Sequence, residues 1–239
     1  MFGLPQLPEK RYFVQPVAWA TGLTANAAYR PLIRLLALMS FLCVGQLALR
    51  VLWTWNDDFA FFSWNLLLAW VPLGCVYLLR FREGLARWKV AALMGAWLLF
   101  LPNAPYLITD LLHLRHWPAV FSIVDELMVF AFALTGLLVG WLSMFLMHEL
   151  AIRSWGEPWS WAFVAGVSVL TGFGVYLGRV QRWNSWDIVT RPLSLVWRAG
   201  GSLDDLTTWV LTVLMALIFF IGYLFFHQLI RLGIRPEQP

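Results

Sequence analysis

Two short segments of this chain gather the side chains that could bind ions or exchange protons. The first begins near residue 97 and, with the residues just after it, supplies two imidazoles and three carboxylates: Asp110, His113, His116, Asp125 and Glu126. Imidazole and carboxylate are the usual ligands of Zn²⁺, Mn²⁺ and Fe²⁺. All five are therefore candidate ligands of a divalent metal ion, and Asp110, His113 and Asp125 are candidate catalytic acids or bases. Their spacing matches no established metal signature such as HExxH, so solvated charges and salt bridges are the alternative interpretation.

The second segment, residues 174–192, favours an anion as its ligand. Arginine guanidinium matches the geometry of phosphate and carboxylate, and two arginines here precede polar side chains set between tryptophans. The candidate residues for binding an anion or a lipid headgroup are Arg179, Arg182, Asn184 and Asp187. In the alternative interpretation the arginines pair with the carboxylates of the first segment, and the tryptophans anchor the loop at headgroup depth.

The composition places both segments in a membrane protein. The chain has 239 residues, of which 61% are hydrophobic and 13% are charged, against about 25% charged residues in a soluble domain. Sixteen tryptophans are typical of a chain with two membrane interfaces. The net charge of +4 forms no basic face, so the sequence gives no indication of nucleic-acid binding. Both cysteines lie in apolar runs, which argues against a disulfide framework.

Hydropathy predicts an all-α, polytopic bundle with short interfacial helices in its outer loops. About 20 apolar residues cross the hydrocarbon layer, and six stretches qualify: 35–55, 59–79, 90–109, 127–147, 159–178 and 206–230. Arg50 interrupts the first stretch, and its side chain is expected to reach for the interface. The predicted organisation is an N-terminal cytoplasmic or interfacial segment (1–31), the bundle (32–231) and a C-terminal cytoplasmic tail (232–239). The N-terminus lacks the pattern of a secretory signal.

Lysine and arginine predict the orientation of these spans. One side of the membrane collects Lys10, Arg11, Arg30, Arg34, Arg80, Arg82, Arg87, Lys89, Arg153, Arg231 and Arg235. The other side holds Arg50, Arg115, Arg179, Arg182, Arg191 and Arg198. Because cytoplasmic loops carry the excess of positive charge, both termini are expected in the cytoplasm. The two polar segments then face the outer side.

The third predicted span is interrupted where the first polar segment begins. Pro102 and Pro105 bracket Asn103, and a proline inside a helix frees carbonyl groups that lipid cannot satisfy. Two interpretations remain open: a packed kink closed by Asn103, or a broken helix that lines a cavity, as in transporter binding sites. The three residues are therefore candidate structural or cavity-forming residues.

Small residues suggest how the two polar segments meet. Gly136 and Gly140 form a GxxxG pattern in the fourth span, and Gly174 and Gly178 form another in the fifth. Such patterns let helices approach closely, so we expect these two spans to touch. The contact would bring the polar segments together and place the Asp110 and His113 side chains within reach of Arg179 or Arg182.

The two segments also carry a family resemblance. Its residues are Pro102, Asn103, Pro105, Tyr106, Asp110 and His113, then Gly178, Arg179, Arg182, Trp183, Asn184, Ser185, Trp186 and Asp187. With them, the region from the second to the sixth span resembles a bacterial integral membrane family known as domain-of-unknown-function family 1361. The resemblance implies a multi-pass protein of the bacterial cytoplasmic membrane and supplies no activity.

Three functions remain open at this stage. The first is an outer-face site that acts on a lipid or lipid-linked headgroup through acid–base or metal chemistry. The second is a structural or assembly partner within a membrane complex, and the third is a small-solute transporter that uses the proline break. The expected partners are the lipid bilayer and an anionic lipid or another membrane subunit. No nucleophile elbow, phosphate-binding glycine loop or dinucleotide fingerprint is present in the sequence.

Overall fold

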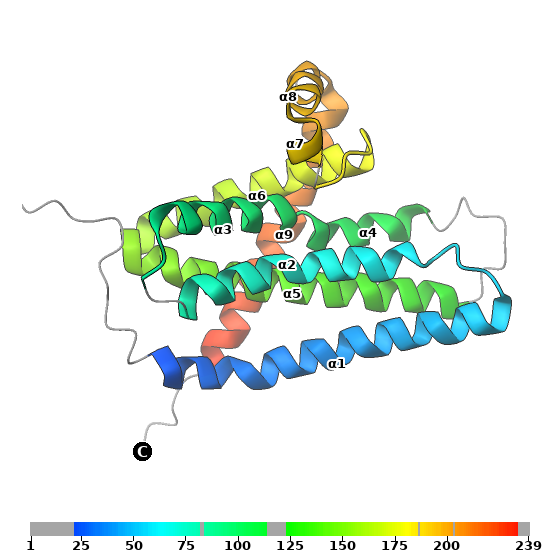
Figure 1. The fold of residues 1–239 in the computed structure, drawn as a ribbon, viewed down its shortest axis with the longest axis horizontal. Helices are drawn as coiled ribbons and strands as arrows, with labels where there is room; N and C mark the ends of the chain where they lie inside the picture. The colour runs from blue at the N-terminus through cyan, green and yellow to red at the C-terminus, as the bar shows by residue number, and fades with distance from the viewer. Residues whose placement is uncertain (1–21, 82–83, 114–122, 186, 203, 234–239) are drawn as a thin grey trace, which may run out of the picture.

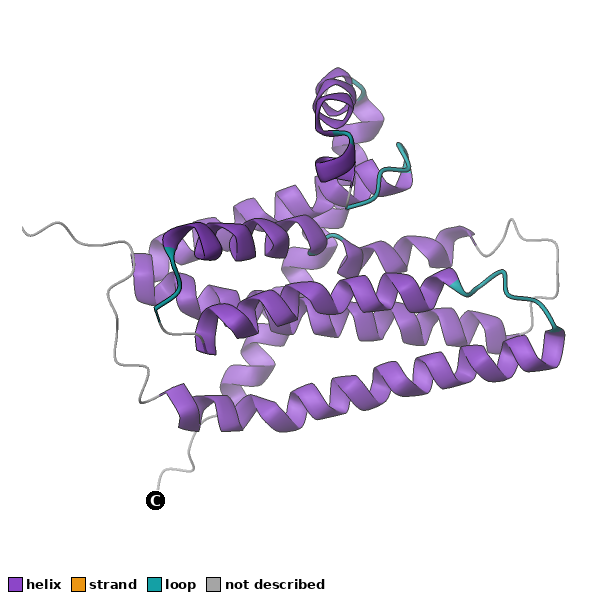
Figure 2. Cartoon of the chain, viewed as in Figure 1, coloured by secondary structure: helices purple, strands orange, loops and turns teal. Residues whose placement is uncertain are grey.

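The computed structural model describes residues 22–81, 84–113, 123–185, 187–202 and 204–233, and within them it contains helices and no strands (Figures 1 and 2). The helices are α1 (Gly22–Thr54), α2 (Phe61–Phe81), α3 (Arg87–Phe100), α4 (Asn103–His113), α5 (Ile123–Trp155), α6 (Glu157–Arg179), α7 (Asp187–Thr190), α8 (Pro192–Gly201) and α9 (Leu206–Gly233). Six segments are long and apolar enough to cross a membrane: α1, α2, α3 with α4, α5, α6 and α9. The predicted all-α bundle with six spans is confirmed.

Helix α5 is the centre of the bundle. Its most apolar 18-residue window is 72% buried, whereas the corresponding windows of the other spans are 17–39% buried. Helices α1, α2, α4, α6 and α9 all contact it. Its side chains at Phe132, Val139, Leu142 and Met144 are fully buried among these neighbours. The other spans therefore present most of their apolar surface outward, as expected where lipid is the solvent.

Helix α1 lies at the edge of the bundle (Figure 1). It begins at Gly22 and runs through Pro31 without interruption, so its first turns belong to the segment 1–31 that the sequence sets apart. Its Arg50 forms an ion pair with the first turn of α5. The Nε atom of Arg50 lies 2.9 Å from Asp125 Oδ1, and the Arg50 side chain is only 11% exposed. The guanidinium also stacks on the Phe59 ring, 4.1 Å from its centroid.

The third span is broken between Phe100 and Asn103. Pro102 has no N–H for the carbonyl of residue 98, and the Ala104 N–H turns to the Leu101 carbonyl at 3.1 Å. Side chains satisfy two of the freed carbonyls. Asn103 Nδ2 donates to the Phe100 carbonyl at 2.8 Å, and Ser185 Oγ donates to the carbonyl of residue 99 at 3.4 Å. Asn103 thus closes the break as proposed, and Ser185 of the second polar segment completes it.

The four glycines of the GxxxG patterns lie against the broken third span. A Cβ atom at Gly136 or Gly140 on α5 would collide with Leu107 or Ala104 of α4, and one at Gly174 on α6 would collide with the Pro102 ring. Helices α5 and α6 do touch, as predicted. The glycines themselves, however, face the kinked segment and α4. This segment packs closely against both α5 and α6, and only residues without a side chain leave enough room for it.

Helix α8 lies at the top of Figure 1, apart from α1, α2 and α5. Figure 1 shows α8 end-on while α1, α2 and α5 are seen from the side, so its axis is close to perpendicular to theirs. Leu193, Val196 and Trp197 are exposed on it at the i, i+3, i+4 spacing that makes one apolar face. This geometry fits a helix that lies in the plane of the membrane interface, as the sequence predicts for the loops on this side.

Candidate functional site

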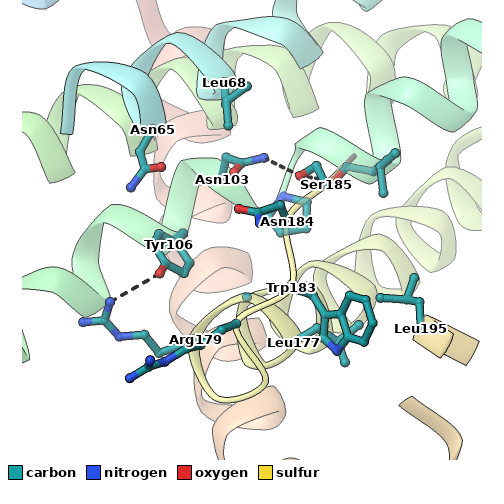
Figure 3. A pocket seen from close by; sticks show the side chains of 15 residues that line it. Asn65, Leu68, Asn103, Tyr106, Leu177, Arg179, Trp183, Asn184, Ser185 and Leu195 are labelled. Atoms are coloured by element: carbon teal, nitrogen blue, oxygen red, sulfur yellow. Dashed lines mark hydrogen bonds between the residues drawn. The ribbon is translucent and has the colours of Figure 1, made fainter. Parts of the chain in front are cut away.

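A cavity of about 400 Å³ lies at the break of the third span (Figure 3). Five elements meet there: α2, the junction of α3 and α4, the last turns of α6, the loop that follows α6, and α8. The lining residues are Asn65, Leu68, Leu99, Pro102, Asn103, Tyr106, Gly174, Leu177, Gly178, Arg179, Arg182, Trp183, Asn184, Ser185 and Leu195. Residues of both polar segments therefore line one cavity, together with an asparagine from α2, but none of the candidate metal ligands with described side chains is among the lining residues.

Arg179 connects α6 to α4 at this site. Its Nη1 atom lies 2.7 Å from Asp110 Oδ1, and its Nη2 atom donates to the Thr109 carbonyl at 2.9 Å. The guanidinium also lies 5.5 Å from the centroid of the Tyr106 ring. Asp110 is 5% exposed, so this is a largely buried ion pair. The predicted proximity of Asp110 to Arg179 is present, and the pair neutralises one of the two arginine charges of the cavity.

Arg182 is held in a turn that usually requires glycine. The N–H of Trp183 donates back to the Leu177 carbonyl at 3.1 Å and closes the end of α6. This closure puts Arg182 at φ +57°, a left-handed conformation that costs a non-glycine residue about 1 kcal/mol or more. The Arg182 side chain is exposed, lines the cavity and has no ion pair or hydrogen bond among the described residues. Its charge is therefore available to a ligand.

Carboxamide groups make up most of the remaining polar lining. Asn65 projects from α2, Asn103 from the first turn of α4 and Asn184 from the loop after α6 (Figure 3). Asn103 Nδ2 donates to Ser185 Oγ at 3.1 Å in addition to the Phe100 carbonyl. The side-chain amides of Asn65 and Asn184 make no hydrogen bond within the described parts of the chain. Asn65 had no place in the sequence-based site, since it lies about thirty residues before the first polar segment.

Asp187 has a structural position. Its Oδ2 atom accepts the Asn184 N–H at 2.7 Å, and its Oδ1 atom accepts the Thr190 hydroxyl at 3.3 Å. Asp187 is the first residue of the short helix α7 and is not among the cavity-lining residues. Its carboxylate fixes the loop that carries Asn184 and Ser185, so its contribution to the cavity is indirect.

The other acidic candidates lie away from the cavity. Asp125 pairs with Arg50 at the start of α5, and Glu126 beside it is exposed. His113 ends α4, but its side chain and the whole of His116 lie outside the described residues. Among the side chains that the structure describes, no group of three His, Cys, Asp or Glu is close enough to hold a metal ion. The metal hypothesis therefore depends on the two histidines.

A second buried polar cluster lies near the C-terminal ends of α5 and α9. The sequence did not reveal it. His148 Nδ1 lies 2.7 Å from the Tyr223 hydroxyl, and His148 Nε2 lies 3.1 Å from Ser160 Oγ. Because the single Ser160 hydrogen goes to the Glu157 carbonyl, Nε2–H must donate to Ser160. A neutral His148 ring then accepts the Tyr223 hydrogen at Nδ1. The His148 side chain is buried, with 1% of the residue exposed.

Neighbouring residues extend this cluster toward α1 and α2. His227 stacks near His148, with ring centroids 5.6 Å apart, and follows Tyr223 by four residues on the same face of α9. Arg80 Nη1 lies 2.5 Å from Glu149 Oε2, and the Tyr29 hydroxyl donates to Glu149 Oε1 at 3.0 Å. The sequence signal for this cluster was the four-residue spacing of Tyr223 and His227, which places both side chains on one face of a helix. These contacts fasten five helices together at the end of the bundle that holds Arg80.

Comparison with known proteins identifies a family and no activity. Residues 64–222 match the family described as "Protein of unknown function (DUF1361)", and the chain belongs to this family. The matched region includes every residue that lines the cavity, while α1 precedes it. No curated protein and no solved structure matches the chain.

Proposed function

We propose that this member of the DUF1361 family binds the anionic headgroup of a lipid or lipid-linked molecule in the cavity at the break of the third span. The proposal rests on a difference between the two arginines that line the cavity, of which one has an ion-pair partner and the other has none among the described residues. Asp110 neutralises Arg179, whereas Arg182 has no partner among the described residues and is held at the cavity by a strained turn. A guanidinium in that position is suited to phosphate.

The neighbourhood of the cavity supports a ligand that arrives from the membrane. Four leucines also line the cavity and supply its apolar surface: Leu68, Leu99, Leu177 and Leu195. Leu195 belongs to α8, whose Leu193, Val196 and Trp197 are exposed on an axis perpendicular to the spans (Figure 1). A headgroup would therefore meet the polar lining while its chains follow the leucines into the surrounding lipid.

We assign the cavity to the outer side of the cytoplasmic membrane of a bacterium. Arg80, Arg87, Lys89, Arg153 and Arg231 gather near the opposite ends of the spans, and short loops rich in Lys and Arg stay in the cytoplasm. Both termini are then cytoplasmic. The Arg179 and Arg182 charges, on the side that usually lacks them, are the ones for which a ligand role is proposed.

Binding rather than acid–base catalysis is the better-supported role. The described carboxylates Asp110 and Asp125 each already pair with an arginine, and neither lines the cavity. A metal-dependent reaction remains a separate hypothesis that rests on His113 and His116. Elemental analysis of the purified protein tests it directly, because a stoichiometric divalent metal would support Asp110 and both histidines as metal ligands.

The test compares two arginine variants for lipid binding. The protein in detergent is titrated with phosphatidylglycerol and with phosphatidylcholine, and binding is followed by native mass spectrometry. Arg182→Gln should weaken phosphatidylglycerol binding about tenfold, which is the loss of one charge-assisted hydrogen bond of about 1.4 kcal/mol. Arg191→Gln removes the same charge from an exposed residue nearby that does not line the cavity, and it should bind as the wild type does.

Two results would contradict the proposal. Equal binding of phosphatidylglycerol and phosphatidylcholine by the wild type would remove the anion preference. Equal losses in Arg182→Gln and Arg191→Gln would reduce the effect to the general charge of the loop. Stoichiometric co-purification of another membrane protein that blocks the titration would favour the assembly-partner alternative instead.

A further inference from the structure

The lining of the cavity includes hydrogen-bond acceptors as well as donors. An anion without a hydrogen to donate cannot pair with those acceptors. Both hydrogens of Asn103 Nδ2 are committed, one to the Phe100 carbonyl and one to Ser185 Oγ. The Phe100 carbonyl can only accept, so it fixes the orientation of the Asn103 amide. Asn103 Oδ1 is therefore left as an acceptor, for which the described residues provide no donor.

Asn65 and Asn184 add two further carbonyl oxygens. Neither side chain has a hydrogen-bond partner in the described part of the chain, and both line the cavity (Figure 3). Asn65 is half-buried on α2, where its immediate neighbours in the chain are apolar. Each carboxamide offers an acceptor oxygen together with two N–H donors. The lining of the cavity thus includes three amide oxygens as well as the Arg182 guanidinium.

A phosphate diester has only acceptor atoms, so it cannot satisfy these oxygens. The part of the ligand that faces the amides must carry O–H or N–H donors, because a polar group that loses water without gaining a partner costs about 1–3 kcal/mol. An ammonium group would supply N–H donors. The lining, however, contains two arginines and no carboxylate, so an ammonium would lack a counter-charge there.

Resting on the headgroup-binding function proposed above, we propose that the ligand is a phospholipid with a polyhydroxyl headgroup, such as glycerol, inositol or a sugar. Arg182 binds its phosphate, and the amides of Asn65, Asn103 and Asn184 bind its hydroxyl groups. A hydroxyl donates one hydrogen and accepts others, which matches the paired acceptor and donors of a carboxamide. Trp183 supplies an apolar face at the same site (Figure 3), against which the C–H face of a polyol packs.

Asn65 is the residue that separates recognition of the hydroxyls from recognition of the charge. It comes from α2, on the far side of the cavity from the loop that carries Arg182 (Figure 3). It closes no break and caps no helix among the described contacts, unlike Asn103. Replacing Asn65 with leucine keeps the approximate volume of the side chain and removes its hydrogen-bonding atoms, so the change should leave the fold intact.

The experiment measures the binding of three lipids with identical acyl chains to the full-length protein in detergent. These are phosphatidylglycerol, phosphatidic acid and phosphatidylethanolamine. Phosphatidic acid carries at least the charge of phosphatidylglycerol but no headgroup hydroxyl, so charge alone predicts that it binds at least as tightly. We expect the wild type to bind phosphatidylglycerol at least fivefold more tightly than phosphatidic acid. Asn65→Leu should abolish this preference and keep the affinity for phosphatidic acid.

Gln46→Leu is the matched control, since it removes an exposed amide of α1 that lies outside the cavity. Equal or tighter binding of phosphatidic acid by the wild type would overturn the polyhydroxyl assignment and leave anion binding intact. Tightest binding of phosphatidylethanolamine would overturn it in favour of an ammonium ligand. Failure of all three lipids would defeat the headgroup-binding function itself. Glycerol phosphate that competes as well as phosphatidylglycerol would show a soluble polyol phosphate and overturn the lipid assignment.

Discussion

The guanidinium of Arg179 and the carboxylate of Asp110 form an ion pair with an Nη1–Oδ1 distance of 2.7 Å, across 69 residues of sequence. The pair joins the end of α6 to the half of the third span that lies beyond its proline break. A helix interrupted at Pro102 has lost the hydrogen bonds that would fix the direction of its second half. Arg179 restores that constraint from a neighbouring helix, and the cavity occupies the space that the break leaves.

Removing one partner of this pair should destabilise the protein strongly. Asp110→Asn leaves the buried Arg179 charge uncompensated, which costs about 3 kcal/mol or more and should lower the melting temperature by roughly 6–12 °C for a chain of this size. The double variant Asp110→Asn with Arg179→Gln should lose less than the sum of the single losses. Glu157→Gln, which breaks an exposed 3.8 Å pair with Arg231, should change stability by less than about 0.5 kcal/mol. A stable, inactive Asp110→Asn variant would point to catalysis instead.

The packing of α6 on the break makes a second prediction. Gly174→Ala places a methyl group against the Pro102 ring, and this overpacking should cost about 1–3 kcal/mol. Gly166→Ala on the same helix meets no atom within 4 Å and should be neutral or slightly stabilising, since alanine favours helix. Thermal unfolding in detergent distinguishes the two. Equal melting temperatures would show that α6 does not support the break.

The buried cluster around His148 makes a third prediction. Tyr223→Phe removes the only donor to His148 Nδ1 among the described residues, and a buried acceptor left without its partner costs about 1–3 kcal/mol. Tyr176→Phe is the control, because Tyr176 is buried on α6 and its hydroxyl makes no hydrogen bond in the described structure. The melting temperature should fall only for Tyr223→Phe. A fall of equal size in both variants would attribute it to repacking.

The orientation of the spans is a fourth prediction. Ala86→Cys before α3 should react with a membrane-impermeant maleimide only after cell lysis, whereas Ser194→Cys on α8 should react in intact cells. Both positions are exposed. The wild type is the blank, since Cys43 and Cys75 are 3% and 8% exposed and should not react. Labelling of position 86 from outside would reverse the assignment of the cavity to the outer side.

The sequence alone determined the class of the protein and the number of its spans. Long apolar segments in a chain with 13% charged residues have one solution in lipid, because a helix satisfies its own backbone. The break at Pro102 was equally local, since proline lacks the N–H that the helix needs. The sequence left open whether Asn103 closes this break or the broken helix lines a cavity.

The tertiary structure alone decided which polar residues work together. Arg50 forms an ion pair with Asp125, and Arg179 forms one with Asp110. The sequence allowed several other pairings of the same charges. Asn65 of α2 lines the cavity. His148 forms a hydrogen bond with Tyr223, from which it is separated by 75 residues in the sequence. Short-range rules fix backbone hydrogen bonds, but the partners of a buried side chain depend on how helices rotate and pack. Here that packing was set by where glycine left room for α4 between α5 and α6.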